Sequence, residues 1–159
     1  MIGDHKQLRP KPYNYELTKK YNFDISMFER LINNGIQYVP LRYQRRMKPI
    51  FADFVRIIYG DKEYIDHPST ANREKPKGFN HDMYFITHNN NEKENSGLSS
   101  KLNTYEAEYL VKLCKYIILQ GYKPEQITLL TLYVGQVLEI RSWTKRLNLN
   151  VRVTSVDNY

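Results

Sequence analysis

The chain has 159 residues, about one ordinary domain, and its 41% hydrophobic and 26% charged residues are typical of a soluble globular protein. No apolar run approaches the roughly 20 residues that cross a bilayer, and the single cysteine, Cys114, excludes an internal disulfide and a cysteine-based metal site, so we expect an intracellular protein, cytoplasmic or nuclear. The net charge of +7 and the fourteen tyrosines favour nucleic-acid binding, because basic surfaces attract phosphates and aromatic rings stack on unpaired bases.

The first half of the chain carries signals for two helices and one strand. Ser26 followed by Glu29 is a capping box, which predicts the start of a short helix. Residues 39–43 have apolar side chains at alternate positions, which predicts a strand. Pro49 suits the first turn of a second helix, and Gly60 is a natural end for it.

The second half alternates strands and helices. Residues 83–87 predict a short strand, and the polar residues 89–100 predict an exposed loop. Asn103 and Glu106 form a second capping box, at the start of a helix that ends at Gly121. The last three elements are a strongly apolar strand, a helix and a final strand, predicted at residues 127–132, 134–147 and 151–156.

This order of elements predicts the fold class. Helices between apolar strands indicate an α/β protein with a mainly parallel sheet and helices on both faces. Trp143 lies on the apolar side of its helix and is predicted to be a core residue. Ligands of such sheets bind beyond the carboxyl ends of the strands, which places residues 44–47, 133–136 and 157–159 at the functional edge. The four histidines lack the spacing of metal ligands, and no metal site is predicted.

Several segments, in order along the chain, carry a resemblance to a known family. They are Gly-Asp-His-Lys-Gln-Leu, Ser-Met-Phe-Glu-Arg-Leu, Leu-Arg-Tyr-Gln-Arg-Arg-Met, Asn-Thr-Tyr-Glu-Ala, the strand and turn ending in Gly-Gln, and Val-Asp-Asn-Tyr, at residues 3–8, 26–31, 41–47, 103–107, 127–136 and 156–159. Together they resemble the superfamily 1 helicases, the group of the nonsense-mediated-decay helicase and senataxin. The Leu-Arg-Pro that follows the first segment is most similar to the NFX-type zinc-finger-containing members.

The resemblance implies a RecA-like P-loop NTPase fold that is incomplete at both ends. Residues 1–38 correspond to the C-terminal tail of a first RecA-like domain with its linker, and residues 39–159 to a truncated second domain. The sequence has no Gly-x-x-x-x-Gly-Lys-Ser/Thr loop to cradle phosphates, and the Asp-Glu pair for Mg²⁺ is expected before Met1. We therefore expect ATP with Mg²⁺ to bind a site completed by residues outside this chain, and the chain alone to be inactive.

Five residues are candidates for the ATP site. By resemblance, Gln7 senses the γ-phosphate, and Arg46 reaches the same phosphate across the cleft between the domains. Asp4, Gln44 and Arg45 are predicted to bind ATP, although Arg45 replaces the tyrosine that stacks on adenine in many relatives. Without the resemblance, Gln7 could simply cap a turn, Asp4 could tie that turn together, and the arginines could form a solvated basic patch.

Five more residues are candidates for nucleic-acid contacts. Thr131, Tyr133 and Gln136 resemble part of the surface that grips the backbone of the nucleic acid. Thr154 and Ser155 precede the last motif and are predicted to act in the same way, because hydroxyl and amide groups bond phosphate oxygens without reading sequence. An ordinary strand position is the alternative for Thr131.

Three functions are compatible with these motifs. The first is part of an ATP-dependent helicase or translocase motor on single-stranded RNA (or DNA), working with the missing first RecA-like domain. The second is an RNA-binding module with a degenerate motor, and the third is a protein-interaction scaffold. Retention of both Gln7 and Arg46 favours the motor, because a binder or scaffold has no use for a pair of γ-phosphate contacts. RNA is preferred through the resemblance alone.

Overall fold

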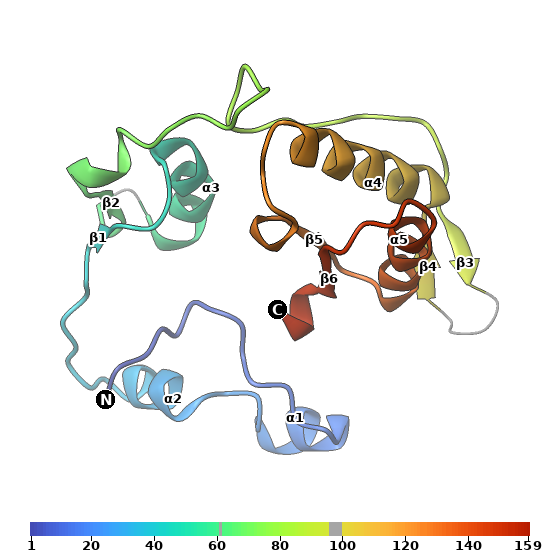
Figure 1. The fold of residues 1–159 in the computed structure, drawn as a ribbon. Coiled ribbons are helices and arrows are strands. Elements are labelled where there is room, and N and C mark those ends of the chain that lie inside the picture. Colours follow the sequence, from blue (N-terminus) through green and yellow to red (C-terminus); the bar gives the residue numbers. More distant parts are fainter. Residues whose placement is uncertain (61, 96–99) are drawn as a thin grey trace. The chain divides into compact units, whose positions relative to one another are not determined.

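A computed structural model describes residues 1–60, 62–95 and 100–159 of the chain (Figure 1). The chain divides into two compact units, residues 1–74 and residues 75–159, and each is described by itself. In the described part, no helix is both long and apolar enough to cross a membrane.

The first unit contains three helices and a pair of short parallel strands. The helices are α1 (Tyr15–Tyr21), α2 (Met27–Asn33) and α3 (Pro49–Tyr59). Strands β1 (Tyr43–Gln44) and β2 (Ile65–Asp66) pair in parallel, and the 3-10 turn η1 (Pro68–Thr70) follows. Because α3 connects two parallel strands, this unit has the strand-helix-strand organisation expected of an α/β protein.

The predicted helix signals of this unit are confirmed, but the predicted strand is largely wrong. The hydroxyl of Ser26 accepts a hydrogen bond from the backbone N–H of Glu29 at 3.1 Å, which caps α2. α3 begins at a proline and ends at Gly60, which has a φ of 91°. Of residues 39–43 only Tyr43 is in a strand, because within the described residues β1 pairs with β2 alone, and that pairing covers two positions.

The second unit is built around two helices and a parallel strand pair. α4 (Thr104–Leu119) is followed by the 3-10 turn η2 (Pro124–Gln126), β5 (Thr128–Thr131), α5 (Val134–Arg146), β6 (Arg152–Ser155) and the 3-10 turn η3 (Val156–Asn158). β5 and β6 pair in parallel in the register Thr131 to Ser155, with α5 as their crossover. The predicted elements at residues 103–121, 127–132, 134–147 and 151–156 are confirmed, with ends that differ by a residue or two.

Two predictions before α4 are wrong. Residues 83–87 form no strand, and Phe85 is 91% exposed, because no strand in the described part of the chain pairs with this segment. Residues 89–100 were expected to be only an exposed loop, yet β3 (Lys93–Asn95) and β4 (Ser100–Leu102) form an antiparallel hairpin there. The part of that prediction covering residues 96–99 lies outside the described residues.

The hydrophobic core of the second unit joins α4, α5, β5 and β6. Its buried members come from these elements and the residue before β5, and they are Ala107, Val111, Cys114, Ile127, Leu129, Val137, Ile140 and Val153. Trp143 packs against this cluster, which confirms its prediction as a core residue. The strand pairs are short and the sheets small, but helices and parallel strands occur in both units, as the α/β prediction requires.

Candidate nucleotide and nucleic-acid sites

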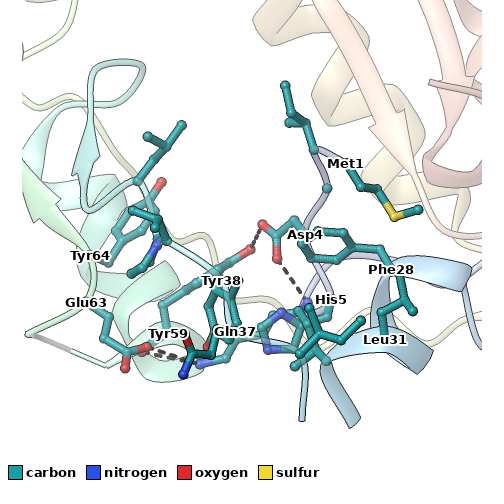
Figure 2. Close-up of a pocket in the computed structure, with 18 residues that line it drawn as sticks. Met1, Asp4, His5, Phe28, Leu31, Gln37, Tyr38, Tyr59, Glu63 and Tyr64 are labelled. Carbon is teal, nitrogen blue, oxygen red and sulfur yellow. Dashed lines mark hydrogen bonds and ion pairs between the residues drawn. The ribbon is translucent and has the colours of Figure 1, made fainter. Parts of the chain in front are cut away.

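The turn that contains Gln7 is organised by the carboxylate of Asp4. One carboxylate oxygen accepts a hydrogen bond from the backbone N–H of Lys6 at 3.0 Å. The other accepts a hydrogen bond from the side-chain amide of Gln7 at 2.9 Å. The same oxygen accepts one from the phenol of Tyr59, the last residue of α3, at 2.5 Å (Figure 2). The turn is therefore closed locally and is also tied to α3.

Lys6 adds a second link between the turn and α3. Its ammonium lies 3.4 Å from the carbonyl oxygens of Ile58 and Tyr59, and 3.7 Å from the carboxylate of Glu63. The last carbonyls of a helix carry partial negative charge and lack partners within the helix, so a lysine stabilises this end of α3.

The contact between Asp4 and Tyr59 changes the ionisation of both groups. Burial opposes charge on Asp4, but hydrogen bonds from Tyr59, the Lys6 backbone and Gln7 outweigh it and hold the pKa of Asp4 below its ordinary value. Burial, together with donation to the Asp4 carboxylate, raises the pKa of Tyr59 to about 12. At neutral pH, Asp4 is thus an anion and Tyr59 a neutral donor.

A cavity of about 750 Å³ lies beside this turn (Figure 2). Its polar lining includes Asp4, Lys6 and Glu63, and its apolar walls include Phe28 and Tyr38. Two carboxylates and one ammonium do not make a phosphate cradle, because the negative charges repel an anion. The cavity alone therefore does not identify a triphosphate site.

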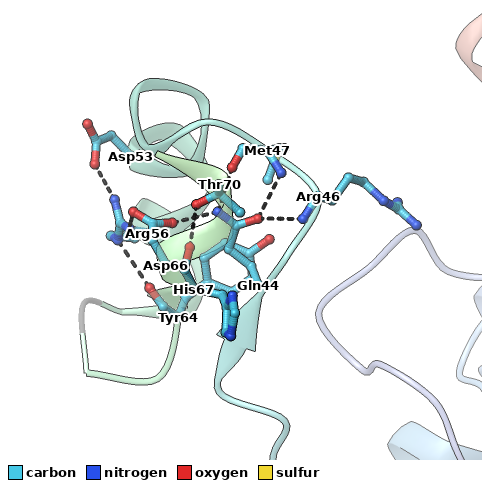
Figure 3. A network of polar contacts seen from close by, with 9 residues as sticks. All are labelled: Gln44, Arg46, Met47, Asp53, Arg56, Tyr64, Asp66, His67 and Thr70. Atoms are coloured by element: carbon cyan, nitrogen blue, oxygen red, sulfur yellow. Dashed lines mark hydrogen bonds and ion pairs between the residues drawn. The ribbon is translucent and has the colours of Figure 1, made fainter. Parts of the chain in front are cut away.

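Gln44 is a buried residue that organises the loop after β1 (Figure 3). Its amide oxygen accepts hydrogen bonds from the backbone N–H groups of Arg46 at 2.9 Å and Met47 at 2.8 Å. Its amide nitrogen donates to the Met47 carbonyl at 2.8 Å and to the Asp66 carboxylate at 2.6 Å. These four bonds use both faces of the amide, so Gln44 shapes the loop and has no polar group directed toward a ligand.

The network continues from Gln44 into α3. Asp66 is paired with the guanidinium of Arg56, which also donates to the carbonyl of Tyr64 at 3.1 Å and pairs with Asp53. Burial opposes charge on Asp66, but the bonds from Gln44 and Arg56 prevail and lower its pKa. α3, β2 and the loop after β1 are thus joined through one chain of charged and amide groups.

Arg46 has a fixed backbone and a free side chain. Its backbone N–H is held by Gln44, while its side chain extends away from the network (Figure 3). Both Arg45 and Arg46 are exposed, and neither guanidinium has a hydrogen bond or ion pair within the described residues. In the described part of the chain there is also no hydrogen bond between Gln7 and Arg46. An exposed, unpaired guanidinium on a braced loop can bind an anion such as a phosphate.

Two of the candidates for nucleic-acid contacts lie at the accessible carboxyl edge of the β5–β6 pair. Thr131 is half-buried beside Ser155 in the strand register, and its hydroxyl accepts a hydrogen bond from the Tyr133 backbone at 3.4 Å. Tyr133 is 47% exposed at the start of α5. These two positions are available to a ligand.

The other three of these candidates are buried and have partners inside the protein. The amide of Gln136 accepts from the Asn103 backbone N–H at 2.6 Å and donates to the Asn103 carbonyl at 3.1 Å. The hydroxyl of Thr154 donates to the carbonyl of Ser155 at 3.3 Å, and the Ser155 hydroxyl accepts from Asn158 at 3.0 Å. The structure gives these three residues packing and capping contacts.

Sequence patterns did not identify every residue that shapes these sites. Tyr59 lies in no motif, and although Lys6 lies in the first motif, nothing in that motif indicates its contact with the end of α3, which is 53 residues away. The partner of Gln136 is the cap of α4, 33 residues earlier. A signal was present for Asn103, because its capping box placed it at the start of a helix.

Comparison with known proteins gives a consistent family. Residues 23–159 match the AAA domain family. The chain is 43% identical over 161 residues to NFX1-type zinc finger-containing protein 1 of Homo sapiens, which covers 100% of this chain and 8% of that protein. It is 39% identical over 165 residues to the helicase required for RNAi-mediated heterochromatin assembly 1 of Schizosaccharomyces pombe, covering 100% of this chain and 16% of the relative.

A third relative is more distant. The chain is 31% identical over 179 residues to RNA helicase aquarius of Mus musculus, covering 100% of this chain and 12% of that protein. The chain therefore spans between 8% and 16% of the length of these three relatives.

Proposed function

Because the chain belongs to the AAA domain family, within the superfamily 1 helicase group and with a RecA-like α/β fold, we propose that it is part of an ATP-dependent motor on RNA. The members of this group share the character of helicase-type nucleic-acid motors. The finer proposal is that Gln7 and Arg46 act together on the γ-phosphate of ATP, within a longer protein that supplies the phosphate loop and the ligands of Mg²⁺. In that protein, residues 1–38 end the first RecA-like domain and residues 39–159 belong to the second.

The chemistry of the two side chains suits phosphoryl transfer. The amide of Gln7 both donates and accepts hydrogen bonds without charge, so it can orient a water toward the phosphate. The guanidinium of Arg46 stays charged and presents a planar set of donors, so it can stabilise the negative charge that develops as the bond to phosphorus breaks. Mg²⁺, when bound with ATP, neutralises phosphate charge in the ground and transition states.

The observation that carries the proposal is the contrast between the backbone and the side chain of Arg46. The buried amide of Gln44 fixes the loop, and the exposed guanidinium has no partner in the described part of the chain. A charged group on a rigid loop stabilises a transition state more than one on a mobile loop does, because less conformational entropy is lost when it contacts the transition state. In this proposal Asp4 and Gln44 act by shaping the ATP site, and the exposed Arg45 contacts the adenine of ATP.

The RNA part of the proposal rests on the second unit and on two relatives. Thr131 and Tyr133 offer a hydroxyl and an exposed ring at one strand edge, a combination that suits backbone contact and base stacking. Gln136, Thr154 and Ser155 support that edge from inside. One relative is named an RNA helicase and another a helicase required for RNAi-mediated heterochromatin assembly.

The test compares Arg46→Ala with Arg42→Ala, a neighbouring exposed arginine, in the longer protein. Loss of an arginine that contacts the γ-phosphate lowers kcat by about 10³- to 10⁵-fold. We expect this loss for Arg46→Ala with RNA affinity almost unchanged, and little effect on kcat for Arg42→Ala.

The alternative is an RNA-binding or protein-interaction module with a degenerate motor fold. It predicts no RNA-stimulated ATP turnover in the wild-type protein. It also predicts that both arginine variants weaken RNA binding to a similar degree, as members of one basic patch. Turnover by the 159-residue chain alone would contradict the proposal that its ATP site is completed elsewhere.

A further inference from the structure

Arg73 is a second residue that holds the loop carrying Arg46, in addition to Gln44. One terminal nitrogen of its guanidinium donates to the backbone carbonyl of Arg45 at 2.7 Å, and the other donates to the carbonyl of Arg46. Next to it, the carbonyl of Glu74 accepts a hydrogen bond from the ammonium of Lys48 at 2.9 Å. All these residues belong to the first unit.

The two sets of bonds fix both polar groups of the Arg46 backbone. Gln44 holds its N–H, and Arg73 holds its carbonyl as well as the preceding one. Rotation of the peptide groups on either side of Arg46 breaks at least one of these bonds. The direction in which the side chain leaves the loop is therefore restrained, although the side chain itself is exposed.

Arginine suits this role better than another cation. Its guanidinium offers donors at fixed positions in one plane, so it can bind two neighbouring carbonyl oxygens at once. A lysine is a single point of charge and cannot hold two carbonyls with the same geometry. In this structure the partners of both terminal nitrogens of Arg73 are backbone carbonyls of the loop, so what Arg73 does here is hold the loop.

We propose that Arg73 is a positioning residue for Arg46, and that it sets the rate of phosphoryl transfer without contacting ATP. The proposal rests on the function proposed above. It extends the site to a position 27 residues beyond Arg46, where the motifs give no signal.

The test uses Arg73→Ala and Arg73→Lys in the longer protein, with Lys75→Ala as the control for loss of a nearby exposed positive charge. A displacement of about 1 Å at a catalytic group can cost about 10²-fold in rate. We expect Arg73→Ala to lower kcat by about 10- to 100-fold, with the KM for ATP and the affinity for RNA within about twofold of the wild type. Arg73→Lys recovers part of the loss, and Lys75→Ala has the wild-type kcat.

Combining Arg73→Ala with Arg46→Ala separates positioning from a general effect on the fold. If Arg73 acts through Arg46, the double variant is no slower than Arg46→Ala alone, because the group being positioned is already gone. The proposal is overturned if the kcat losses of the two single variants multiply in the double variant, or if Arg73→Ala leaves kcat unchanged.

Hydrogen exchange gives a readout that does not depend on ATP turnover. Loss of two hydrogen bonds to the loop should speed exchange at the amides of Arg46 and Met47 by about tenfold in Arg73→Ala, with no change in Lys75→Ala. Unchanged exchange refutes the positioning role. If exchange increases but Arg46→Ala keeps full activity, Arg73 still holds the loop, and the function proposed for Arg46 is the part that fails.

Discussion

Replacement of Gln44 tests the reasoning about the loop most directly. Gln44→Ala removes four hydrogen bonds of 2.6 to 2.9 Å from a buried position. A typical hydrogen bond contributes about 0.5–1.5 kcal/mol net, so four bonds amount to about 2–6 kcal/mol. Arg46 is exposed and Met47 half-buried, so water replaces some of these partners. We therefore expect a loss of about 2–3 kcal/mol from the free energy of unfolding of this region.

A second variant separates hydrogen bonding from side-chain volume. Gln44→Glu keeps the size of the side chain and one acceptor oxygen, but its other oxygen faces the Met47 carbonyl and the Asp66 carboxylate, which need donors. At neutral pH this variant should be at least as unstable as Gln44→Ala, because two negative charges then meet. Gln37→Ala is the matched control, since Gln37 is exposed and has no hydrogen-bond partner in the described residues.

Two assays are used: urea unfolding gives the free energy of unfolding, and hydrogen exchange is measured in peptides that cover residues 43–48 and 65–70. A loss of about 2–3 kcal/mol corresponds to about 30- to 140-fold faster exchange through the open state. The wild-type stability of this region should also fall in acid, because the lowered pKa of Asp66 gives stability that is present above 3.8 and lost as pH falls through the folded value. The reasoning is refuted if Gln44→Glu unfolds within about 0.5 kcal/mol of the wild type.

Three further outcomes are expected. Asp4→Asn should lower the pKa of Tyr59 from about 12, because the neutral phenol loses its anionic acceptor while its burial stays the same. Tyrosine absorbance titrations measure this pKa, when the curve of the same protein carrying Tyr59→Phe is subtracted to isolate the signal of Tyr59. Gln136→Ala should cost about 2 kcal/mol in urea unfolding of the second unit, because it leaves the buried backbone N–H of Asn103 without its acceptor and leaves the Asn103 carbonyl with only the Ala107 N–H. Cys114 should react with a thiol reagent far more slowly in the folded protein than in urea, because burial raises its pKa and excludes the reagent.

Local chemistry made several elements predictable from the sequence. The capping boxes at Ser26 and Asn103 mark the starts of α2 and α4, because the side-chain oxygen and the N–H that it caps are three residues apart. Residues 127–132 combine an apolar run with flanking turns, and β5 forms there. Signals of this kind need no knowledge of distant residues.

Pairing between distant segments was not predictable in the same way. Residues 39–43 have a strand-like pattern, but a strand exists only where a partner is present, and β2 offers just two positions. The hairpin of β3 and β4 arose in a polar stretch with no apolar alternation.

The site residues show the same contrast between local signals and distant partners. Motif resemblance selected Gln44 and Gln136, and the structure places both in buried hydrogen-bond networks. A motif records which residue type occupies a position, but the direction of its side chain depends on partners such as Asp66 and Asn103. Arg73 had no motif at all, because its partners are backbone carbonyls that carry no side-chain signature.

The paired bonds between Gln136 and Asn103 have a mechanical consequence. They join the first turn of α5 to the cap of α4, with one bond in each direction. Tyr133 and Thr131 lie directly before that turn. In the proposed motor, RNA bound at this edge would exert force on the start of α5. The two bonds would transmit part of that force to α4, so both helices would resist it.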